Sequence, residues 1–173
     1  MRFLPRLLRL TVLAALLLPA SAAQARVYRA GPLQAADPWS RPAVAGLNGV
    51  GYLRLANRGP GPETLVKVES PLARRVEMHR SSLSGAVMSM APVARIETPA
   101  GGAVVFAPGG YHLMFLDLKR TLRPGDQLPA TLIFADGRKL RLAFAVGSGE
   151  APVGHSDAAG GRVAERSQSV TKK

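Results

Sequence analysis

Apolar and polar residues alternate along many short segments of the chain, and most of these segments end at glycine, proline or asparagine. In residues 49–57 the alternation places Leu53 and Leu55 on one face and Tyr52 on the other. The run Asn57-Arg58-Gly59-Pro60-Gly61-Pro62 then ends this segment abruptly. A period of two residues predicts β-strands, and helical periodicity is nearly absent.

Further segments repeat this pattern and are separated by turn-forming residues. They cover residues 64–68, 73–80, 87–90, 103–106, 111–118, 127–134 and 139–146. Ser84-Gly85 falls where a hairpin turn is needed between residues 73–80 and 87–90, and Asp136-Gly137 precedes the last segment. Seven to nine short strands at this spacing predict an all-β fold, an antiparallel β-sandwich.

The two ends of the chain differ from this central region. Residues 1–25 combine three arginines, an apolar run and the small-residue sequence Ala23-Gln24-Ala25, which predicts a signal peptide and export to the periplasm. The apolar run is short for a membrane span, so we expect no stable membrane insertion after cleavage; an uncleaved anchor is the alternative. Residues 148–173 are rich in Gly, Ala, Ser, Lys and Arg, which predicts a disordered tail. Residues 26–147 then form a single domain.

Charge and cysteine content narrow the functional classes. The formal net charge of +12 falls to +9 once the three arginines of the leader are removed. The basic residues are scattered and not interleaved with aromatic residues, so we expect a solvated basic surface and no nucleic-acid partner. The chain contains no cysteine, which rules out disulfides and the thiolate ligand of a blue-copper site.

Four residues form the strongest chemical pattern: His79, Met90, His112 and Met114. Two imidazoles and two thioethers make a soft donor set that favours Cu(I). His112 and Met114 lie on the same face of a strand, with their Cα atoms about 7 Å apart. The Ser84-Gly85 turn folds Met90 back towards His79, so one ion can be reached from all four if the two segments are neighbours in the fold.

Neighbouring residues have more than one interpretation. Met88 lies two residues from Met90 and is a possible substitute ligand, whereas Met78 alternates to the opposite face from His79 and is expected in the core. Glu77 shares a face with His79 and is either an orienting partner of the imidazole or half of a surface ion pair with an arginine.

Residues 76–123 resemble the periplasmic copper chaperones called PCu(A)C, which are implicated in supplying the Cu(A) centre of cytochrome c oxidase. The signature of that family is a His, ten residues, a Met, twenty-one residues and His-x-Met, and His79, Met90, His112 and Met114 meet it without a gap. The likeness extends over about residues 33–147 and includes Asp37-Pro38-Trp39-Ser40-Arg41. It implies a cupredoxin-like β-sandwich that binds Cu(I) through these four side chains.

The resemblance also implies a partner, a copper acceptor such as the Cu(A) subunit or another periplasmic copper chaperone. The competing interpretation is a metal-free exported β-sandwich that acts as an interaction module. We do not expect an enzyme, because no Ser-His-Asp grouping, paired carboxylates or phosphate-binding loop stands out. Trp39 is expected in the core, with a role as a shield beside the metal as the alternative.

Overall fold

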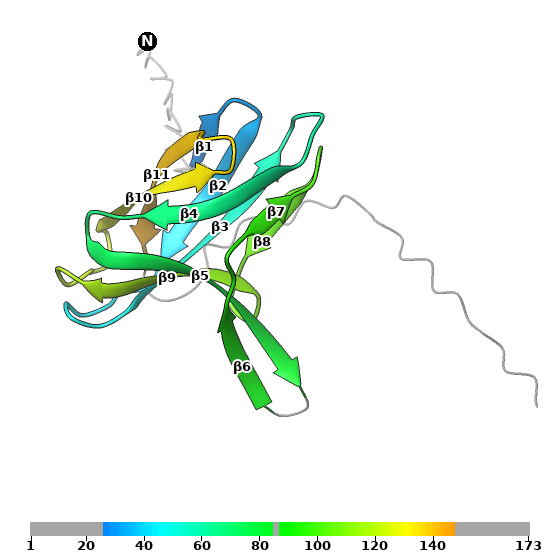
Figure 1. Cartoon of the computed structure of the whole chain (residues 1–173). Coiled ribbons are helices and arrows are strands. Elements are labelled where there is room, and N and C mark those ends of the chain that lie inside the picture. Colours follow the sequence, from blue (N-terminus) through cyan, green and yellow to red (C-terminus); the bar gives the residue numbers. More distant parts are fainter. Residues whose placement is uncertain (1–25, 85–86, 148–173) are drawn as a thin grey trace, which may run out of the picture.

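The computed structural model describes residues 26–84 and 87–147 of the 173-residue chain. These residues form eleven strands and no helix (Figure 1). The strands are β1 (Val27–Ala30), β2 (Leu33–Ser40), β3 (Gly49–Asn57), β4 (Glu63–Glu69), β5 (Ala73–Ser84), β6 (Val87–Pro92), β7 (Ile96–Thr98), β8 (Ala103–Phe106), β9 (Tyr111–Leu118), β10 (Gln127–Phe134) and β11 (Lys139–Val146). No helix that could cross a membrane occurs among the described residues.

All eleven strands belong to one sheet that curls around its own core. The strand order is β6-β5-β9-β8-β3-β2-β11-β10-β4-β7, with β1 added at β2 and a further pairing between β9 and β3. In Figure 1 the β5–β9 pair crosses below the strands β2, β3, β4, β10 and β11, and the β5–β6 hairpin extends away from the body. Two pairings, β11 with β2 and β8 with β9, are parallel, and the others are antiparallel. The predicted all-β class is confirmed.

The interior is filled by apolar side chains from both layers of the curled sheet. The largest fully buried ones are Phe106, Phe115, Phe134, Phe144, Leu33, Leu55, Leu65, Leu113, Leu118, Leu122, Leu128 and Leu132. Phe115 and Phe144 meet edge to face, with ring centroids 5.5 Å apart. A Cβ atom at Gly51 would approach these two rings to 2.7 Å and 3.0 Å, so only glycine fits there. Each fully buried Leu or Phe contributes about 1.5–3 kcal/mol of transfer free energy.

Most predicted strands coincide with observed ones. The predicted segments 49–57, 103–106, 111–118, 127–134 and 139–146 match β3, β8, β9, β10 and β11. The segments predicted at 64–68, 73–80 and 87–90 are longer in the structure, whereas β1, β2 and β7 were not predicted. The signal peptide, its cleavage site and the tail at 148–173 fall outside the described residues and stay predictions.

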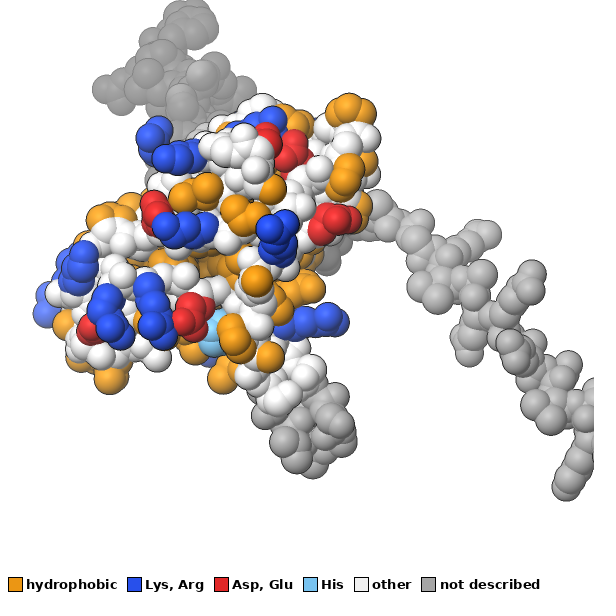
Figure 2. Space-filling model, viewed as in Figure 1, with side chains coloured by type: hydrophobic (Ala, Val, Ile, Leu, Met, Phe, Trp, Pro, Cys, Tyr) orange, Lys and Arg blue, Asp and Glu red, His pale blue; other side chains and the backbone are white. Residues whose placement is uncertain are grey.

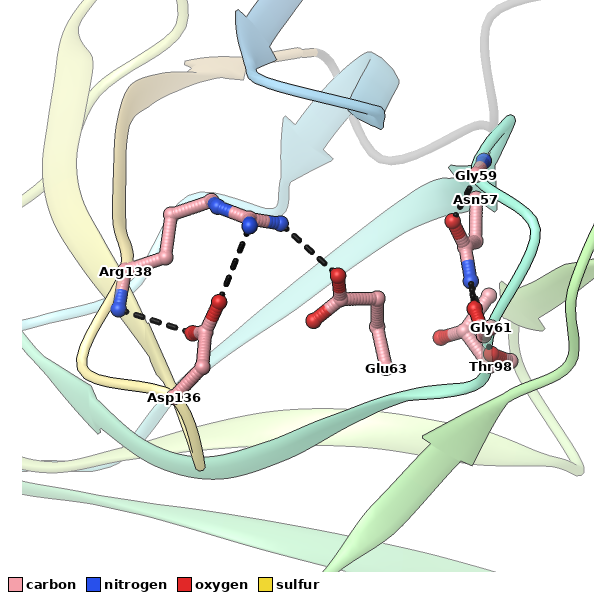
Figure 3. A network of polar contacts seen from close by, with 7 residues as sticks. All are labelled: Asn57, Gly59, Gly61, Glu63, Thr98, Asp136 and Arg138. Atoms are coloured by element: carbon pink, nitrogen blue, oxygen red, sulfur yellow. Dashed lines mark hydrogen bonds and ion pairs between the residues drawn. The ribbon is translucent and has the colours of Figure 1, made fainter.

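A buried polar cluster joins the loop after β3 to β7. Asn57 is 1% exposed, and its Nδ2 donates hydrogen bonds to the carbonyl oxygens of Gly61 (2.7 Å) and Thr98 (3.3 Å). Its Oδ1 accepts a hydrogen bond of 2.9 Å from the backbone N–H of Gly59 (Figure 3). The amide side chain thereby replaces backbone partners that an irregular loop cannot supply.

An ion-pair cluster lies near the first one and connects the β10–β11 turn with the start of β4. Arg138 Nη1 donates to Glu63 Oε1 at 2.8 Å, and Nη2 lies 2.9 Å from Asp136 Oδ2. Asp136 Oδ1 also accepts a hydrogen bond from the Arg138 backbone N–H (Figure 3). Both clusters pair their side-chain atoms closely and tie loops to the sheet.

Candidate metal centre

The pairing of β5 with β9 places the two predicted histidine ligands beside each other. His79 and His112 are directly opposite in the antiparallel register, and their ring centroids are 5.6 Å apart. His112 is buried at 4% exposure, and the side chain of His79 is 14% exposed. The required proximity of these two chain segments is therefore present in the structure.

Met114 continues the same face of the sheet one pleat away from His112. Its register partners are Glu77 on β5 and Val50 on β3, and its side chain is half-buried. Because residues i and i+2 of a strand share a face, Met114 and His112 point to the same side of β9. The face opposite to the core thus carries an imidazole and a thioether in sequence.

Met90 reaches the same side from the edge strand β6. It pairs with Ser81, which shares a face of β5 with His79, and it is 58% exposed. The hairpin predicted around Ser84-Gly85 is present as the β5–β6 pairing, although residues 85–86 themselves lie outside the described residues. The side chain of the alternative ligand Met88 is also outside the described part of the structure.

Three of the four predicted donors line one hollow of about 300 Å³. Its lining residues are Val50, Tyr52, Ser81, Met90, Pro108, Gly109, His112 and Met114. No carboxylate belongs to this lining, and the fourth donor, His79, lies next to it through its contact with His112. Figure 2 shows a histidine surface next to acidic and apolar side chains, with basic side chains farther along the same face. The hollow offers soft donors in apolar surroundings.

A larger hollow of about 600 Å³ has a different chemical character. Its lining includes Lys67, Arg74, Arg75, Lys119 and Glu69, and it contains neither histidine nor methionine. Volume alone would select this groove as the binding site. The donor chemistry of His112, Met114 and Met90 instead makes the smaller hollow the candidate site for a metal ion.

Each imidazole has one nitrogen engaged by an acceptor that fixes where its proton resides. His112 Nδ1 is 3.2 Å from the carbonyl oxygen of Gly110, so it carries the proton and donates it. His79 Nε2 is 3.0 Å from Glu77 Oε2, and its Nδ1 is buried without a hydrogen-bond partner in the described structure. Each neutral ring therefore keeps one lone pair for a metal ion.

Glu77 makes both contacts that the sequence left open as alternatives. Its Oε1 lies 2.8 Å from Arg75 Nε, while Oε2 accepts the hydrogen bond from His79. The hydrogen bond from His79 and the positive charge of Arg75 lower the pKa of the Glu77 carboxyl below its ordinary value. Glu77 is consequently a carboxylate near neutral pH, able only to accept hydrogen bonds.

An aromatic pair lies at one side of the hollow, where Tyr52 forms part of the lining and Trp39 packs behind it. Trp39 and Tyr52 are register partners on β2 and β3, their ring centroids are 4.5 Å apart, and both are buried. Trp39 is buried as expected, but it packs on Tyr52 outside the main core cluster. Burial raises the pKa of the Tyr52 hydroxyl, with Arg41 acting in the opposite direction. Met78, by contrast, lies in the core as predicted.

Sequence patterns did not identify Val50, Tyr52 and Pro108 as walls of the hollow. The available signal was Tyr52, an aromatic residue on the opposite face of β3 from Leu53 and Leu55. Within residues 26–84 and 87–147, no three His, Asp or Glu side chains come together as a metal-binding group. The donor set assembled here thus combines imidazole with thioether sulfur.

A family model described as "Putative lipoprotein LpqE-like" matches residues 33–146. The chain belongs to the LpqE-like family. A relative in Leifsonia xyli subsp. xyli, described as "Putative lipoprotein Lxx21020", is 32% identical over 151 residues, covering 82% of this chain and 90% of the relative. The LpqE-like match spans nearly the whole described sheet, from β2 to β11.

Solved structures of PCuAC domains share this fold. The apo PCuAC domain from PmoF1 is 26% identical with a TM-score of 0.59, and covers 73% of this chain and 100% of that domain. The copper-bound PCuAC domain from PmoF2 is 25% identical with a TM-score of 0.61, covering 71% and 98%. Apo-DR1885 from Deinococcus radiodurans is 29% identical with a TM-score of 0.53, covering 74% and 87%. The resemblance to PCu(A)C proteins and the cupredoxin-like β-sandwich are confirmed.

Proposed function

We propose that this protein is a periplasmic copper chaperone that binds one Cu(I) ion through His79, Met90, His112 and Met114. The observation that supports the proposal is that Met90, His112 and Met114 line one hollow, while His79 lies directly opposite His112 on β5. The similarity to a copper-bound PCuAC domain supports copper as the cargo. The protein acts as a carrier rather than an enzyme.

The donor chemistry favours Cu(I) over harder ions. Thioether sulfur is polarisable and carries no proton, and the hollow lining lacks the carboxylates that Mg²⁺, Ca²⁺ or Mn²⁺ require. The lone-pair nitrogen of each imidazole completes a set of two nitrogen and two sulfur donors. Walls formed by Val50, Tyr52 and Pro108 keep the surroundings apolar.

Release proceeds by ligand exchange at the most exposed donor. Met90 is 58% exposed on an edge strand, whereas His112 is 4% exposed between two neighbouring strands. An incoming sulfur of the acceptor displaces Met90 first, while His112 and Met114 still hold the ion. The acceptor we propose is the Cu(A) subunit of cytochrome c oxidase, with another periplasmic copper chaperone as the alternative.

Competition with a chromophoric Cu(I) chelator tests the binding site. The purified protein should withdraw one equivalent of Cu(I) from the chelator, and His112→Ala or Met114→Ala should abolish this. His155→Ala is the matched control, because it removes the one histidine outside the pattern. Comparing Met90→Leu with Met88→Leu identifies the second sulfur ligand, since only substitution of the true ligand should weaken Cu(I) binding. If His112→Ala and Met114→Ala both bind Cu(I) as tightly as the wild-type protein, the assignment of the site is wrong.

Transfer requires a separate experiment. Cu(I)-loaded protein is mixed with the apo Cu(A) subunit, the two are separated, and copper is measured in each fraction. Movement of copper to the subunit, faster than release to buffer, is the expected result. Retention of all copper by the carrier would exclude this acceptor.

The basic groove around Arg74, Arg75 and Lys119 favours the second function, a metal-free module that binds an acidic partner. The two functions differ in one simple measurement. Specific Cu(I) binding to the native state must raise the melting temperature, whereas a metal-free module shows no such shift.

A further inference from the structure

The two histidines of the site are held by different acceptors at different ring nitrogens. His79 Nε2 lies 3.0 Å from the Glu77 carboxylate, whereas His112 Nδ1 lies 3.2 Å from the backbone carbonyl oxygen of Gly110. The nitrogen left over in His79 is Nδ1, a buried atom without a partner. The two histidines, although paired directly across the sheet, therefore leave different ring nitrogens without a hydrogen bond: Nδ1 in His79 and Nε2 in His112.

We infer that Glu77 is a positioning residue that fixes His79 as an Nδ1 ligand of copper, while His112 serves as an Nε2 ligand. The inference deepens the proposed function and rests on it for the identity of the ion. It assigns to Glu77 a task that the four-residue metal-binding pattern does not include.

The reason lies in what each group can donate and accept. A neutral imidazole has one N–H and one lone pair, and a carboxylate accepts but cannot donate. With the proton on Nδ1, the Nε2 lone pair of His79 would face Glu77 Oε2 at 3.0 Å, an electrostatically unfavourable contact. Glu77 therefore selects the Nε2–H tautomer, as carboxylate partners of metal-binding histidines commonly do.

Glu77 is itself held in place by a second contact. The 2.8 Å contact with Arg75 Nε occupies its other oxygen, and three residues at alternate positions of β5, Arg75, Glu77 and His79, form a chain on one face. The orientation of the imidazole is thereby fixed before the ion arrives.

This arrangement also places the ion with respect to the strands. Nδ1 is bonded to the ring carbon that carries the side chain, whereas Nε2 lies at the far end of the ring. If copper binds, His79 would hold it through Nδ1, His112 through Nε2, and Met90 would approach from β6, the strand next to β5.

Long-range proton–nitrogen NMR of the histidine rings tests the inference without metal. At about pH 8, the wild-type apoprotein should show His79 protonated at Nε2 and His112 protonated at Nδ1. Glu77→Ala should give a mixture of tautomers at His79 and leave His112 unchanged. Glu77→Gln keeps the shape of the side chain but can donate as well as accept, so it should also allow both tautomers at His79, which would identify the carboxylate as the selecting group.

Copper binding supplies the second measurement. Adding Cu(I) should shift the Nδ1 resonance of His79 and the Nε2 resonance of His112. Glu77→Ala should raise the Cu(I) dissociation constant about 10–100-fold, as expected for the loss of an orienting partner, and Glu77→Gln should raise it less. Glu69→Ala is the matched control, because Glu69 is likewise paired with a basic residue, Lys67, yet contacts no histidine.

The outcomes separate the inference from the proposed function. An Nδ1–H form of His79 in the wild-type apoprotein overturns the inference, as does a Glu77→Ala protein that matches Glu69→Ala in tautomer and affinity. If Glu77→Ala does not fold, the tautomer of His79 in the wild-type protein and in Glu77→Gln tests the inference instead. If the wild-type protein binds no Cu(I), the proposed function fails, and the metal-free NMR measurement still decides the role of Glu77.

Discussion

Two polar clusters of this protein differ in how completely their atoms are paired. Around Asn57 both side-chain atoms have partners, and nearby Arg138 connects two carboxylates (Figure 3). Between β5 and β9, His79 and His112 each use one nitrogen in a hydrogen bond and keep the other as a lone pair. The first cluster joins loops to the sheet, and the second retains capacity for an external ligand.

An unpaired buried atom indicates a binding site only where other donors surround it. Thr98 Oγ1 is buried without a partner in the described structure, as His79 Nδ1 is. Thr98, however, offers a single hydroxyl, while His79 lies beside His112, which lines a hollow with two thioethers. The unpaired Thr98 hydroxyl lowers the stability of the fold. The cost of leaving His79 Nδ1 unpaired would be recovered when a ligand binds to it.

The largest effect is expected from Asn57→Ala. The substitution removes three hydrogen bonds made by a side chain whose residue is 1% exposed, so the free energy of unfolding should fall by about 3 kcal/mol. Chemical denaturation measures this change, and Cu(I) affinity of the folded protein should stay the same. Asn48→Ala is the control, since Asn48 makes one exposed hydrogen bond. Weaker copper binding in Asn57→Ala would contradict the separation of the two clusters.

His112→Ala should have the converse effect. Loss of a ligand should weaken Cu(I) binding at least about 100-fold, or about 2.8 kcal/mol, because even an orienting partner accounts for up to that factor. The free energy of unfolding of the apoprotein should fall by only about 1–2 kcal/mol, because His112 is 4% exposed and its hydrogen bond to the Gly110 carbonyl oxygen is lost. Chelator competition and denaturation of one preparation give both values. A large loss of stability with unchanged affinity would make His112 a structural residue.

Thr98→Val should stabilise the protein by about 1 kcal/mol. Valine has nearly the same shape and removes a hydroxyl that is buried without a partner, and it leaves the backbone carbonyl that accepts from Asn57 in place. Denaturant midpoints measure the gain. Thr121→Val provides the contrast, because Thr121 Oγ1 accepts a hydrogen bond from the Ala45 N–H and its loss should be slightly destabilising. Destabilisation by Thr98→Val would mean that this hydroxyl is satisfied in solution.

The smallest effect concerns the exposed ion pair at Asp126. A hydrogen bond from the Arg123 backbone N–H and the charge of Arg120 lower the pKa of the Asp126 carboxyl. The stabilisation is therefore present above the unfolded-state pKa, about 3.9, and is lost as pH falls through the lower folded-state pKa. Asp126→Asn should lower the melting temperature slightly at pH 7, and the difference should vanish in acid. An equal difference at every pH would exclude this electrostatic origin.

The sequence predicts regular strands well and irregular ones poorly. Turn residues at the ends of β3 gave its bounds directly, because alternation and turn chemistry agree there. Strand β2 escaped prediction because Asp37 adopts a positive φ of 48° and the register shifts between Ala36 and Trp39, which interrupts the alternation. Strand β7 has three residues, too few for a pattern. The parallel pairing of β2 with β11 brings together segments that are far apart in the sequence, and local periodicity does not predict such a pairing.

The site shows the same division. That His112 and Met114 share a face follows from the strand period alone. That His79 lies opposite His112 depends on long-range pairing of β5 with β9, and the family spacing rather than local pattern pointed to it. The contacts of Glu77 depend on side-chain rotamers, so the sequence left both of its roles open. The sequence therefore identified the candidate donors, and the pairing of the strands in the structure showed how they are arranged.

The stacked pair of Trp39 and Tyr52 gives the protein a built-in optical reporter. Trp39 is the one tryptophan of the chain, and it touches the tyrosine that walls the hollow. An ion entering beside that tyrosine changes the surroundings of a single indole, so its emission intensity reports loading and unloading without an attached dye. Stopped-flow fluorescence can thus time the delivery of cargo in unmodified protein.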